Sequence, residues 1–347
     1  MSKIPKQPLD WANLDFSYRT TSSRYVAMYR DGRWDKGGLT EDPNVVLSEC
    51  AGIFHYCQEV FEGLKAYETR AGDIVTFRPD LNASRMHQSA QLMQMPPFPE
   101  EWFLEAVEET VRANASWVPP HESGASLYIR PYMIASGVVI GVAPAREYMF
   151  RILTTPVGPY FRGGVRPLRL CVSRYDRAAP HGTGMIKAGL NYAMSLHAYV
   201  EAHEQGYDEN LFLDPATRTY VEETGGANFL FVTPSREVVI PQSPSILPSI
   251  TRRSLTHVAE HYLKLRVTER PVRLDELDSF SECGLCGTAA VIAPVGRVID
   301  VTHGDREYVF RDNAERMGPV LQELYDTLVG IQHGTIEAPP GWIRRIL

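Results

Sequence analysis

The segment PVGPYFRGGVRP, residues 156–167, constrains the fold more than any other stretch of this chain. It holds three prolines and three glycines, which interrupt helices and strands alike. A chain of 347 residues is also too long for one small core and suits two domains. We therefore expect a small N-terminal domain over residues 1–155, an interdomain loop over 156–167 and a larger domain over 168–347.

Both predicted domains mix short strands with helices. The expected elements before the loop are β-rich runs within 24–79 (GIFHYC, 52–57, among them), helices at 81–94 and 99–116, and strands at 126–140 and 147–156. Those after the loop are a strand at 168–174, a helix near 189–205, strands within 210–241, a helix at 251–265, strands within 285–300 and a last helix at 311–331. Because neither a βαβ rhythm nor an internal repeat occurs, the chain is predicted to be α+β, with a mostly β centre in the second domain.

Charge and composition exclude several kinds of partner. The 35 Lys and Arg against 42 Asp and Glu give a formal net charge of −7, and no basic run stands out, so nucleic acid is not expected as a partner. The longest apolar stretch, 132–143, is too short to span a membrane, and the N-terminus lacks the apolar core of a signal peptide. Five cysteines are an odd number for a disulfide framework. We expect a cytoplasmic protein with reduced thiols and no membrane partner.

The segment GTGMIKAGLNYAMS, 182–195, places Lys187 among glycines, with Asn191 and Tyr192 within the next helical turn. Glycines let the backbone turn tightly and approach another group closely. A lysine in such a place can be a surface charge, a phosphate ligand, or an amine that forms a Schiff base. The surface charge is the simplest of these alternatives, because most lysines are exposed.

Two other patterns in the sequence could act together with Lys187 at one site. Glu222 and Glu223 stand at a strand end before an apolar run and need a cation or hydrogen-bond donors if they are buried, although they could also be solvated at a hairpin end. The segments 247–255 and 286–295 combine hydroxyls with free backbone amides, which suit a phosphate but also an ordinary helix cap. A lysine, an acid and a phosphate site together are what pyridoxal 5′-phosphate requires.

A series of motifs carries a resemblance to a known family. They include QEVFEGLKAYE (58–68), LNASRMHQSA (81–90), SLYIRP (126–131), KAGLNYA (187–193), EETGGANFLFV (222–232), SITR (249–252) and CGTAAVIAPVG (286–296). In order and spacing the chain resembles the branched-chain amino acid aminotransferases, within the class IV pyridoxal-phosphate enzymes. The resemblance covers nearly the whole chain. It implies the two-domain fold of D-amino acid aminotransferase, with a small α/β domain and a larger domain that has a β-barrel-like core.

The resemblance also implies roles for individual residues. Lys187 would be the Schiff-base lysine, Glu223 the partner of the pyridine nitrogen, and Tyr192 the donor to the ring's phenolate oxygen. The residues implied for the phosphate are Arg85, Ile250, Thr251 and Thr288. Those implied for the substrate are Phe16, Tyr56, Tyr128, Arg130 and Tyr160 around its side chain, and Thr288 with Ala289 at its α-carboxylate.

The activity implied by the resemblance is reversible ping-pong transamination of leucine, isoleucine and valine with 2-oxoglutarate, in a homodimer or a larger homo-oligomer. One pocket must then accept an aliphatic side chain and, in the other half-reaction, the γ-carboxylate of glutamate. Aromatic walls satisfy the first demand, and Arg130 can satisfy the second. Lys187 would move the proton at the substrate's Cα as general base and acid.

Three residues depart from the family's pattern: Leu190 and Ser249 replace glycines, and Gly226 replaces a threonine that many relatives carry. A leucine after Lys187-Ala-Gly could move the loop or crowd the cofactor. The departures therefore bear on the substrate range.

Several alternatives stay open at this point. Lys65 in EGLKAYE is a rival for the Schiff base, HVAEH (257–261) fits an inverted zinc-protease pattern, and CGLC (283–286) has thioredoxin-like spacing. We expect no metal, since the family needs none there. Within the fold, D-amino acid aminotransferase, (R)-amine transaminase and aminodeoxychorismate lyase are competing activities.

Overall fold

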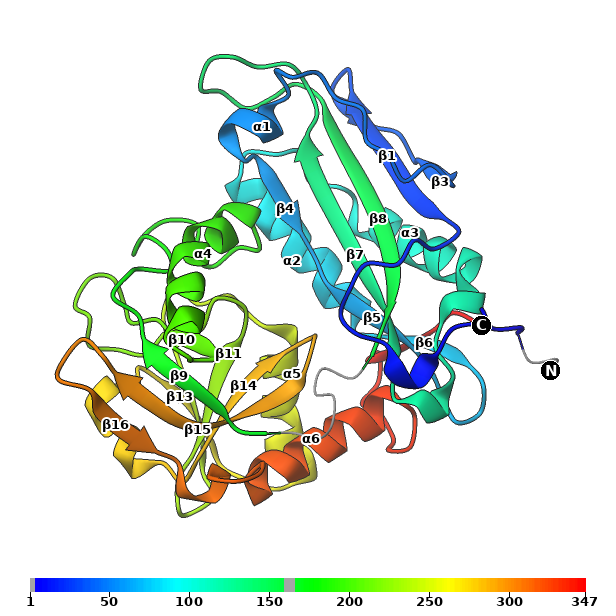
Figure 1. Cartoon of the computed structure of the whole chain (residues 1–347). Coiled ribbons are helices and arrows are strands. Elements are labelled where there is room, and N and C mark those ends of the chain that lie inside the picture. The colour runs from blue at the N-terminus through cyan, green and yellow to red at the C-terminus, as the bar shows by residue number, and fades with distance from the viewer. Residues whose placement is uncertain (1–3, 159–165) are drawn as a thin grey trace. The chain divides into compact units, whose positions relative to one another are not determined.

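The computed structural model describes residues 4–158 and 166–347, which divide into two units with separate hydrophobic cores (Figure 1). Unit 1 comprises residues 1–160, 186–190 and 330–347, and unit 2 comprises 161–185 and 191–329. The mixed α/β architecture and the class IV fold are confirmed.

Two segments of unit 1 lie on the C-terminal side of the proline-glycine loop. Residues 186–190 and 330–347 come after the proline-glycine loop in sequence but belong to unit 1. Ile186 and Ala188 are buried in the unit 1 core, because burial removes their apolar side chains from water. The predicted boundary at 156–167 itself stays a prediction, since part of that loop lies outside the described residues.

Unit 1 is built on one antiparallel sheet, which has nine strands among the described residues. Its order is β17-β6-β5-β7-β8-β1-β2, while β3 pairs with β1 and β4 with β7. The elements are η1 (Trp11–Asn13), β1 (Arg24–Arg30), β2 (Arg33–Trp34), β3 (Gly38–Thr40), α1 (Gly52–Tyr56), β4 (Glu59–Phe61), β5 (Leu64–Glu68), β6 (Ile74–Phe77), α2 (Pro79–Leu92), α3 (Glu100–Ala113), η2 (Ala115–Trp117), η3 (His121–Ser123), β7 (Ser126–Ala135), β8 (Tyr148–Val157) and β17 (Ile343–Arg345).

Most of the expected unit 1 elements are confirmed within a few residues, but GIFHYC is not a strand. It forms α1, which ends where Cys57 takes the left-handed conformation with φ 49° and donates its N–H to the carbonyl of Ile53. This cap turns the chain directly into β4.

The alternation of side chains along β7 separates the two faces of the unit 1 sheet. Leu127 and Ile129 point into the core with α2 and α3, which lie behind β7 and β8 in the view of Figure 1. Tyr128 and Arg130 point to the opposite face, because successive residues of a strand alternate. Phe61 shares this second face, since it pairs directly with Tyr132 of β7.

Unit 2 contains a mixed sheet of eight strands within its described residues, in the order β10-β9-β15-β14-β11-β12-β13, with β16 paired to β15. A mostly β centre is therefore confirmed. The elements are β9 (Leu168–Val172), α4 (Gly189–Glu204, whose first two residues belong to unit 1), β10 (Glu209–Leu211), β11 (Asn228–Val232), β12 (Val238–Pro241), α5 (Ile250–His257), the π-helical η4 (Val258–Tyr262), β13 (Val267–Arg270), η5 (Leu274–Ser279), β14 (Glu282–Gly287), β15 (Val291–Asp300), β16 (Arg306–Val309), η6 (Arg311–Asn313) and α6 (Pro319–Gln332, whose residues from 330 on belong to unit 1).

The last helix begins later than expected, at Pro319 instead of near residue 311. The Glu282 carboxylate of β14 accepts hydrogen bonds from the N–H groups of Val320 and Leu321, at 3.0 and 2.9 Å. A side chain at Gly318 would overlap this carboxylate. A strand residue far away in sequence therefore determines where α6 starts, which a local pattern cannot reveal.

Across residues 4–158 and 166–347, none of the helices combines the length and the apolar character that crossing a membrane requires.

We predict that Phe150→Ala destabilises unit 1 by about 3–5 kcal/mol. Phe150 is fully buried and stacks on Phe98 with a centroid separation of 4.1 Å, so its loss leaves a cavity that the aromatic cluster cannot refill. The measurement is the urea midpoint followed by near-ultraviolet circular dichroism. The control is Leu92→Ala at an exposed position of α2, and equal shifts for the two variants would contradict the prediction.

Candidate active site

The backbone around Lys187 is tied to unit 1 on both sides. The Lys187 N–H donates to Ser89 Oγ of α2 at 3.2 Å, and its carbonyl accepts from the Phe61 N–H of β4 at 3.0 Å. Two residues further on, the Gly189 N–H donates to Glu59 Oε2 at 2.8 Å. These three hydrogen bonds hold the lysine's segment beside β4 just where α4 begins.

The Lys187 side chain shares an aromatic neighbour with Arg130. Lys187 Nζ lies 4.7 Å from the centroid of the Phe61 ring, and the Arg130 guanidinium carbon lies 4.8 Å from the same centroid. Arg130 Nη2 donates to the Tyr128 hydroxyl at 3.0 Å, and Phe16 meets Tyr128 edge-on with centroids 5.1 Å apart. Arg130 Nε is buried and has no hydrogen-bond partner in the described part of the chain. An amine and a guanidinium therefore stand beside one aromatic wall, which suits an apolar group next to a carboxylate.

Lys65, the rival lysine, lies on β5 directly opposite Tyr128. It is buried, and burial lowers its pKa to about 8. Its charge contributes to lowering the pKa of His333, which burial brings to about 4. Lys65 thus has the lowered pKa that a Schiff-base lysine needs, so an experiment must separate it from Lys187.

The other substrate and phosphate residues predicted in unit 1 have separate surroundings. Tyr56, the last residue of α1, donates its hydroxyl to the carbonyl of Ile140 in the loop after β7. Arg85 is buried and donates from Nε and Nη2 to the Glu62 carboxylate at 2.7 and 2.8 Å. Glu62 therefore orients the guanidinium that the phosphate role needs. Tyr160 lies outside the described residues.

In unit 2, Glu223 is buried and held by three partners. Its carboxylate forms an ion pair with Arg177 at 2.9 Å and accepts from Asn228 Nδ2 at 2.7 Å and from the Leu247 N–H at 2.9 Å. The guanidinium offsets the charge of a carboxylate taken out of water. Arg177 was missed by sequence reasoning, because nothing in the segment RAAP connects it to an acid 46 positions away.

Glu222 is also buried but has different partners, the hydroxyls of Ser243 (2.7 Å) and Ser245. The alternative that both acids are solvated at a hairpin end is therefore wrong. Consecutive residues of an extended chain point to opposite sides, which gives the two carboxylates separate environments.

The residues predicted for the phosphate lie at helix and turn positions of unit 2. Ser249 is the N-cap of α5 and accepts from the Arg252 N–H at 3.2 Å, so Ile250 and Thr251 occupy the helix's first turn. Thr288 and Ala289 form the turn between β14 and β15. Amides at a helix start and a hydroxyl in a tight turn are good anion ligands.

The pairing of β11 with β14 shows how this turn is placed relative to Glu223. Asn228, the partner of Glu223, pairs with Cys286 of β14, so the turn at Thr288 lies at the same end of the sheet. A side chain added at Gly226 would meet no atom within 4 Å. Asn228 Oδ1 is buried without a hydrogen-bond partner among the residues the structure describes. An acid, an unsatisfied amide oxygen and an open glycine loop fit a polar aromatic cofactor such as pyridoxal phosphate.

The fold accommodates each departure from the family's pattern. Leu190 packs its side chain against the unit 1 core, so α4 starts normally without the usual glycine. Ser249 caps α5, and Gly226 lies in open space.

Neither of the motifs that suggested another enzyme class forms a matching site. Cys283 and Cys286 are buried on one strand, three residues apart. They therefore face opposite sides about 10 Å from each other, too far for a disulfide. The rings of His257 and His261 are tilted by 40° to each other, with centroids 4.2 Å apart. No group of three metal-binding side chains occurs in the described ranges.

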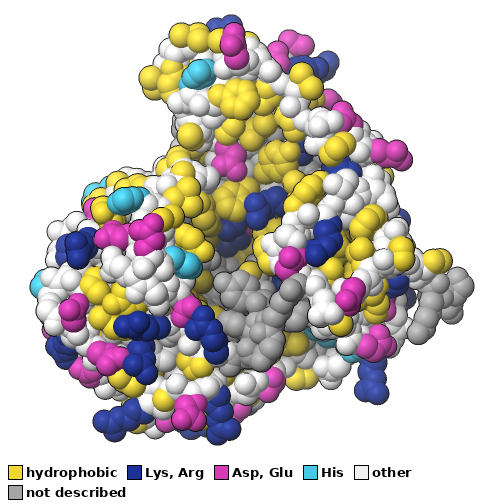
Figure 2. Space-filling view, viewed as in Figure 1, with side chains coloured by type: hydrophobic (Ala, Val, Ile, Leu, Met, Phe, Trp, Pro, Cys, Tyr) yellow, Lys and Arg dark blue, Asp and Glu magenta, His cyan; other side chains and the backbone are white. Residues whose placement is uncertain are grey.

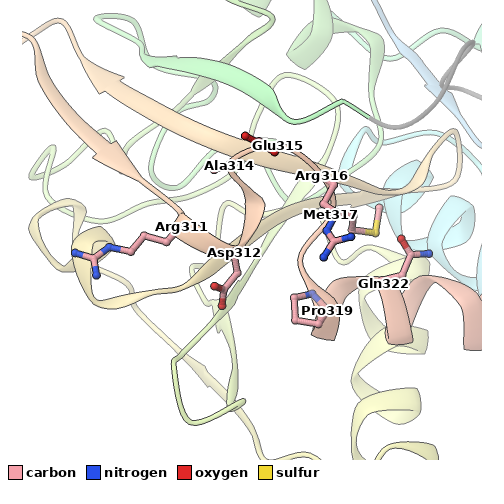
Figure 3. A pocket seen from close by; sticks show the side chains of 8 residues that line it. All are labelled: Arg311, Asp312, Ala314, Glu315, Arg316, Met317, Pro319 and Gln322. Atoms are coloured by element: carbon pink, nitrogen blue, oxygen red, sulfur yellow. The ribbon is translucent and has the colours of Figure 1, made fainter.

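A pocket of about 630 Å³ in unit 2 contains none of the predicted site residues. It lies between η6 and the start of α6, and its lining is Arg311, Asp312, Ala314, Glu315, Arg316, Met317, Pro319 and Gln322 (Figure 3). Its charged side chains are exposed and of both signs, so it shows no preference for a ligand.

Comparison with known proteins agrees with the motifs. The chain is 47% identical to branched-chain-amino-acid aminotransferases of Haemophilus influenzae (97% of this chain, 99% of the relative) and Helicobacter pylori (96% and 97%). Its fold matches the Escherichia coli branched-chain amino acid aminotransferase with a TM-score of 0.78 at 27% identity, over 94% of this chain and all of that one. The Thermobaculum terrenum branched-chain amino acid aminotransferase, solved in its PLP-form, gives 0.77 at 26% identity over 95% and 100%.

A family model described as amino-transferase class IV matches residues 59–298, which is more than half of the chain. This range contains Lys187, Glu223 and Thr288, and it begins at the residue that caps α4. The chain belongs to the class IV aminotransferases.

Proposed function

We propose that this protein is a branched-chain amino acid transaminase, which exchanges the amino group of L-leucine, L-isoleucine or L-valine with 2-oxoglutarate. The observation that carries the proposal is the placement of the Lys187 amine and the Arg130 guanidinium beside the same Phe61 ring. That arrangement meets the two demands of the reaction, an apolar contact and a γ-carboxylate ligand. The relatives at 47% identity are named for the same activity.

Pyridoxal 5′-phosphate is the cofactor of this family and supplies a carbonyl and an electron sink when bound. We infer that the residues that bind it are Lys187, Tyr192, Glu223, Arg85, Ile250, Thr251 and Thr288. Support comes from the buried Glu223 carboxylate, which is paired with Arg177, and from the first turn of α5. The first can hold a proton-bearing ring nitrogen and the second a phosphate.

Among the residues that we assign to the substrate, one transfers a proton and the others bind. Lys187 moves a proton at the substrate's Cα, because an amine is a suitable general base and acid once it is desolvated. Arg130 binds the γ-carboxylate of glutamate, and the rings of Phe16 and Tyr128 contact an aliphatic side chain. The further residues we assign to the substrate are Tyr56 and Tyr160 at its side chain and the backbone of Thr288 and Ala289 at its α-carboxylate.

We also propose a homodimer as the smallest assembly. The loop between β7 and β8 exposes Val138, Ile140 and Val142, the last with 91% of its surface accessible, and Phe54 of α1 is exposed as well. Figure 2 shows hydrophobic side chains at the surface around α1, at the top of the view. An apolar cluster of this kind on a water-exposed loop is typical of a protein interface.

A cytoplasmic location fits the cysteines. All five are free thiols, and three of them, Cys171, Cys283 and Cys286, are buried. Structural thiols persist in the reducing cytoplasm. We therefore infer that the enzyme works there.

The proposed function predicts that the purified enzyme transaminates L-leucine with 2-oxoglutarate and not D-alanine. Lys187→Ala should lose the cofactor's visible absorbance band and at least about 10³-fold in turnover, because the amine that moves the proton is gone. The measurement is the absorbance spectrum before and after L-leucine, together with glutamate formation.

Lys65→Ala is the control for Lys187→Ala, since it removes the other buried lysine. It should keep the absorbance band. A band that survives Lys187→Ala but disappears in Lys65→Ala would transfer the assignment to Lys65, and activity confined to D-alanine would contradict the proposed substrate class.

Arg130→Met should lower kcat/KM for L-glutamate by about tenfold to a hundredfold, because a charged hydrogen bond to the γ-carboxylate is lost. The loss for L-leucine should stay below about threefold, since methionine keeps an apolar contact with Phe61. Both values come from steady-state kinetics at fixed 2-oxo acid. Equal losses for the two substrates would count against a γ-carboxylate role.

The combined Val138→Asp and Val142→Asp variant should dissociate the dimer, weakening association by more than about a hundredfold because the new carboxylates would be buried. Light scattering after gel filtration should give twice 39.0 kDa for the unchanged chain and 39.0 kDa for the variant. Val46→Asp, at another exposed valine, is the control and should remain dimeric. A variant that stays dimeric would place the interface elsewhere.

A further inference from the structure

Glu59 is a half-buried acid beside Lys187 that has no role in the reaction as proposed. It lies on β4, two residues before Phe61, so its side chain points to the same face of the unit 1 sheet as the Phe61 ring. A carboxylate is costly in partly buried surroundings unless it is paired. Two kinds of group stabilise the Glu59 carboxylate in this position, and each gives a reason for its being there.

The first reason is the start of α4. Glu59 Oε2 accepts the N–H of Gly189, the first residue of this 16-residue helix, at 2.8 Å. A negative group at a helix N-terminus satisfies an otherwise unpaired amide and interacts favourably with the helix dipole. A side chain at position 189 would overlap the carboxylate, so a larger residue there would displace Glu59 from this cap.

The second reason is charge. Burial raises the pKa of Glu59, while the Gly189 N–H and the positive charges of Arg130 and Lys187 act in the opposite direction. Arg130 comes from β7 and Lys187 from the segment before α4. Both cations adjoin the Phe61 ring on the same sheet face. Glu59 is thus the anion shared by the two cations of the proposed site.

Glu282 shows what such a cap looks like without these cations. It also projects from a strand, accepts two N–H groups at the start of α6 and overlaps any side chain at the adjacent Gly318. Asp312 and Arg236 are the charged groups that act on it. The chain therefore offers a matched helix cap that has no contact with Lys187 or Arg130 among its described interactions.

We propose that Glu59 is a positioning residue of the transamination site, which anchors the start of α4 next to Lys187 and serves as the counter-ion of Lys187 and Arg130. This inference rests on the proposed role of Lys187. The anchoring depends on the carboxylate as a hydrogen-bond acceptor, and the counter-ion effect depends on its charge. The two effects can be separated, because glutamine keeps an acceptor oxygen but carries no charge.

The test uses the cofactor-loaded enzyme with Glu59→Gln and Glu59→Ala. The pH midpoint of the cofactor's visible band should fall by about one unit in both variants, because a nearby negative charge stabilises the protonated form of the lysine-cofactor linkage. Hydrogen exchange of peptides that cover residues 186–192 should become about tenfold faster in Glu59→Ala and stay near the unchanged rate in Glu59→Gln.

Two controls isolate these effects. Glu101→Gln removes an exposed charge of unit 1, and Glu282→Gln alters the other helix cap. Both should leave the pH midpoint and the exchange of residues 186–192 unchanged. If Glu59→Ala does not fold, Glu59→Gln alone still tests the counter-ion, since its midpoint must fall.

A midpoint in Glu59→Gln equal to that of Glu101→Gln would overturn the counter-ion role, and unchanged exchange in Glu59→Ala would overturn the anchoring role. A failure of the proposed function looks different, since the visible band would then survive Lys187→Ala. If Lys187→Ala loses the visible band but the Glu59 variants keep the pH midpoint and the exchange rate of the unchanged enzyme, only the inference on Glu59 is contradicted.

Discussion

The arrangement of unit 1 depends on the backbone pairing of β7 with β4, β5 and β8. Because side chains alternate along a strand, this pairing sends Leu127 and Ile129 into the core and Tyr128 and Arg130 to the opposite face. The register with β4 then places Phe61 on that second face. A shift of one residue would exchange the two sets, which would bury the guanidinium and expose the core leucine. Stability and the chemistry of the site are therefore set by the same hydrogen bonds.

Buried carboxylates organise the polar parts of both units. Glu62 holds Arg85, Glu223 pairs with Arg177, and Glu282 starts α6. Each of these carboxylates accepts hydrogen bonds from two or more donors, which offsets the cost of removing a charge from water. In a partly apolar interior, charged groups held in this way keep their positions. Such preorganised charges suit a reaction in which a proton is transferred on the substrate.

Sequence patterns predicted the elements that have a strong local signal. The helices α2, α3 and α4 and the long strands β7 and β8 lie within a few residues of their expected bounds, because apolar periodicity and turn residues act locally. The short α1 was read as a strand, since five residues carry too little periodicity. The start of α6 was misplaced because Glu282, 38 residues before Val320, sets it. Arg177 and Glu59 were overlooked for the same reason, since their partners are distant in sequence.

The sequence by itself determined the class of this protein, for the ordered motifs around Lys187, Glu223 and Thr288 suffice to identify the family. It also determined which residue types are present that can bind an anion, a ring nitrogen or an aliphatic chain. Only the tertiary structure decided the partners of those groups: Arg177 for Glu223, Glu62 for Arg85 and Phe61 for both Lys187 and Arg130. Partner choice depends on strand register and on contacts between distant segments, and a linear pattern does not contain either.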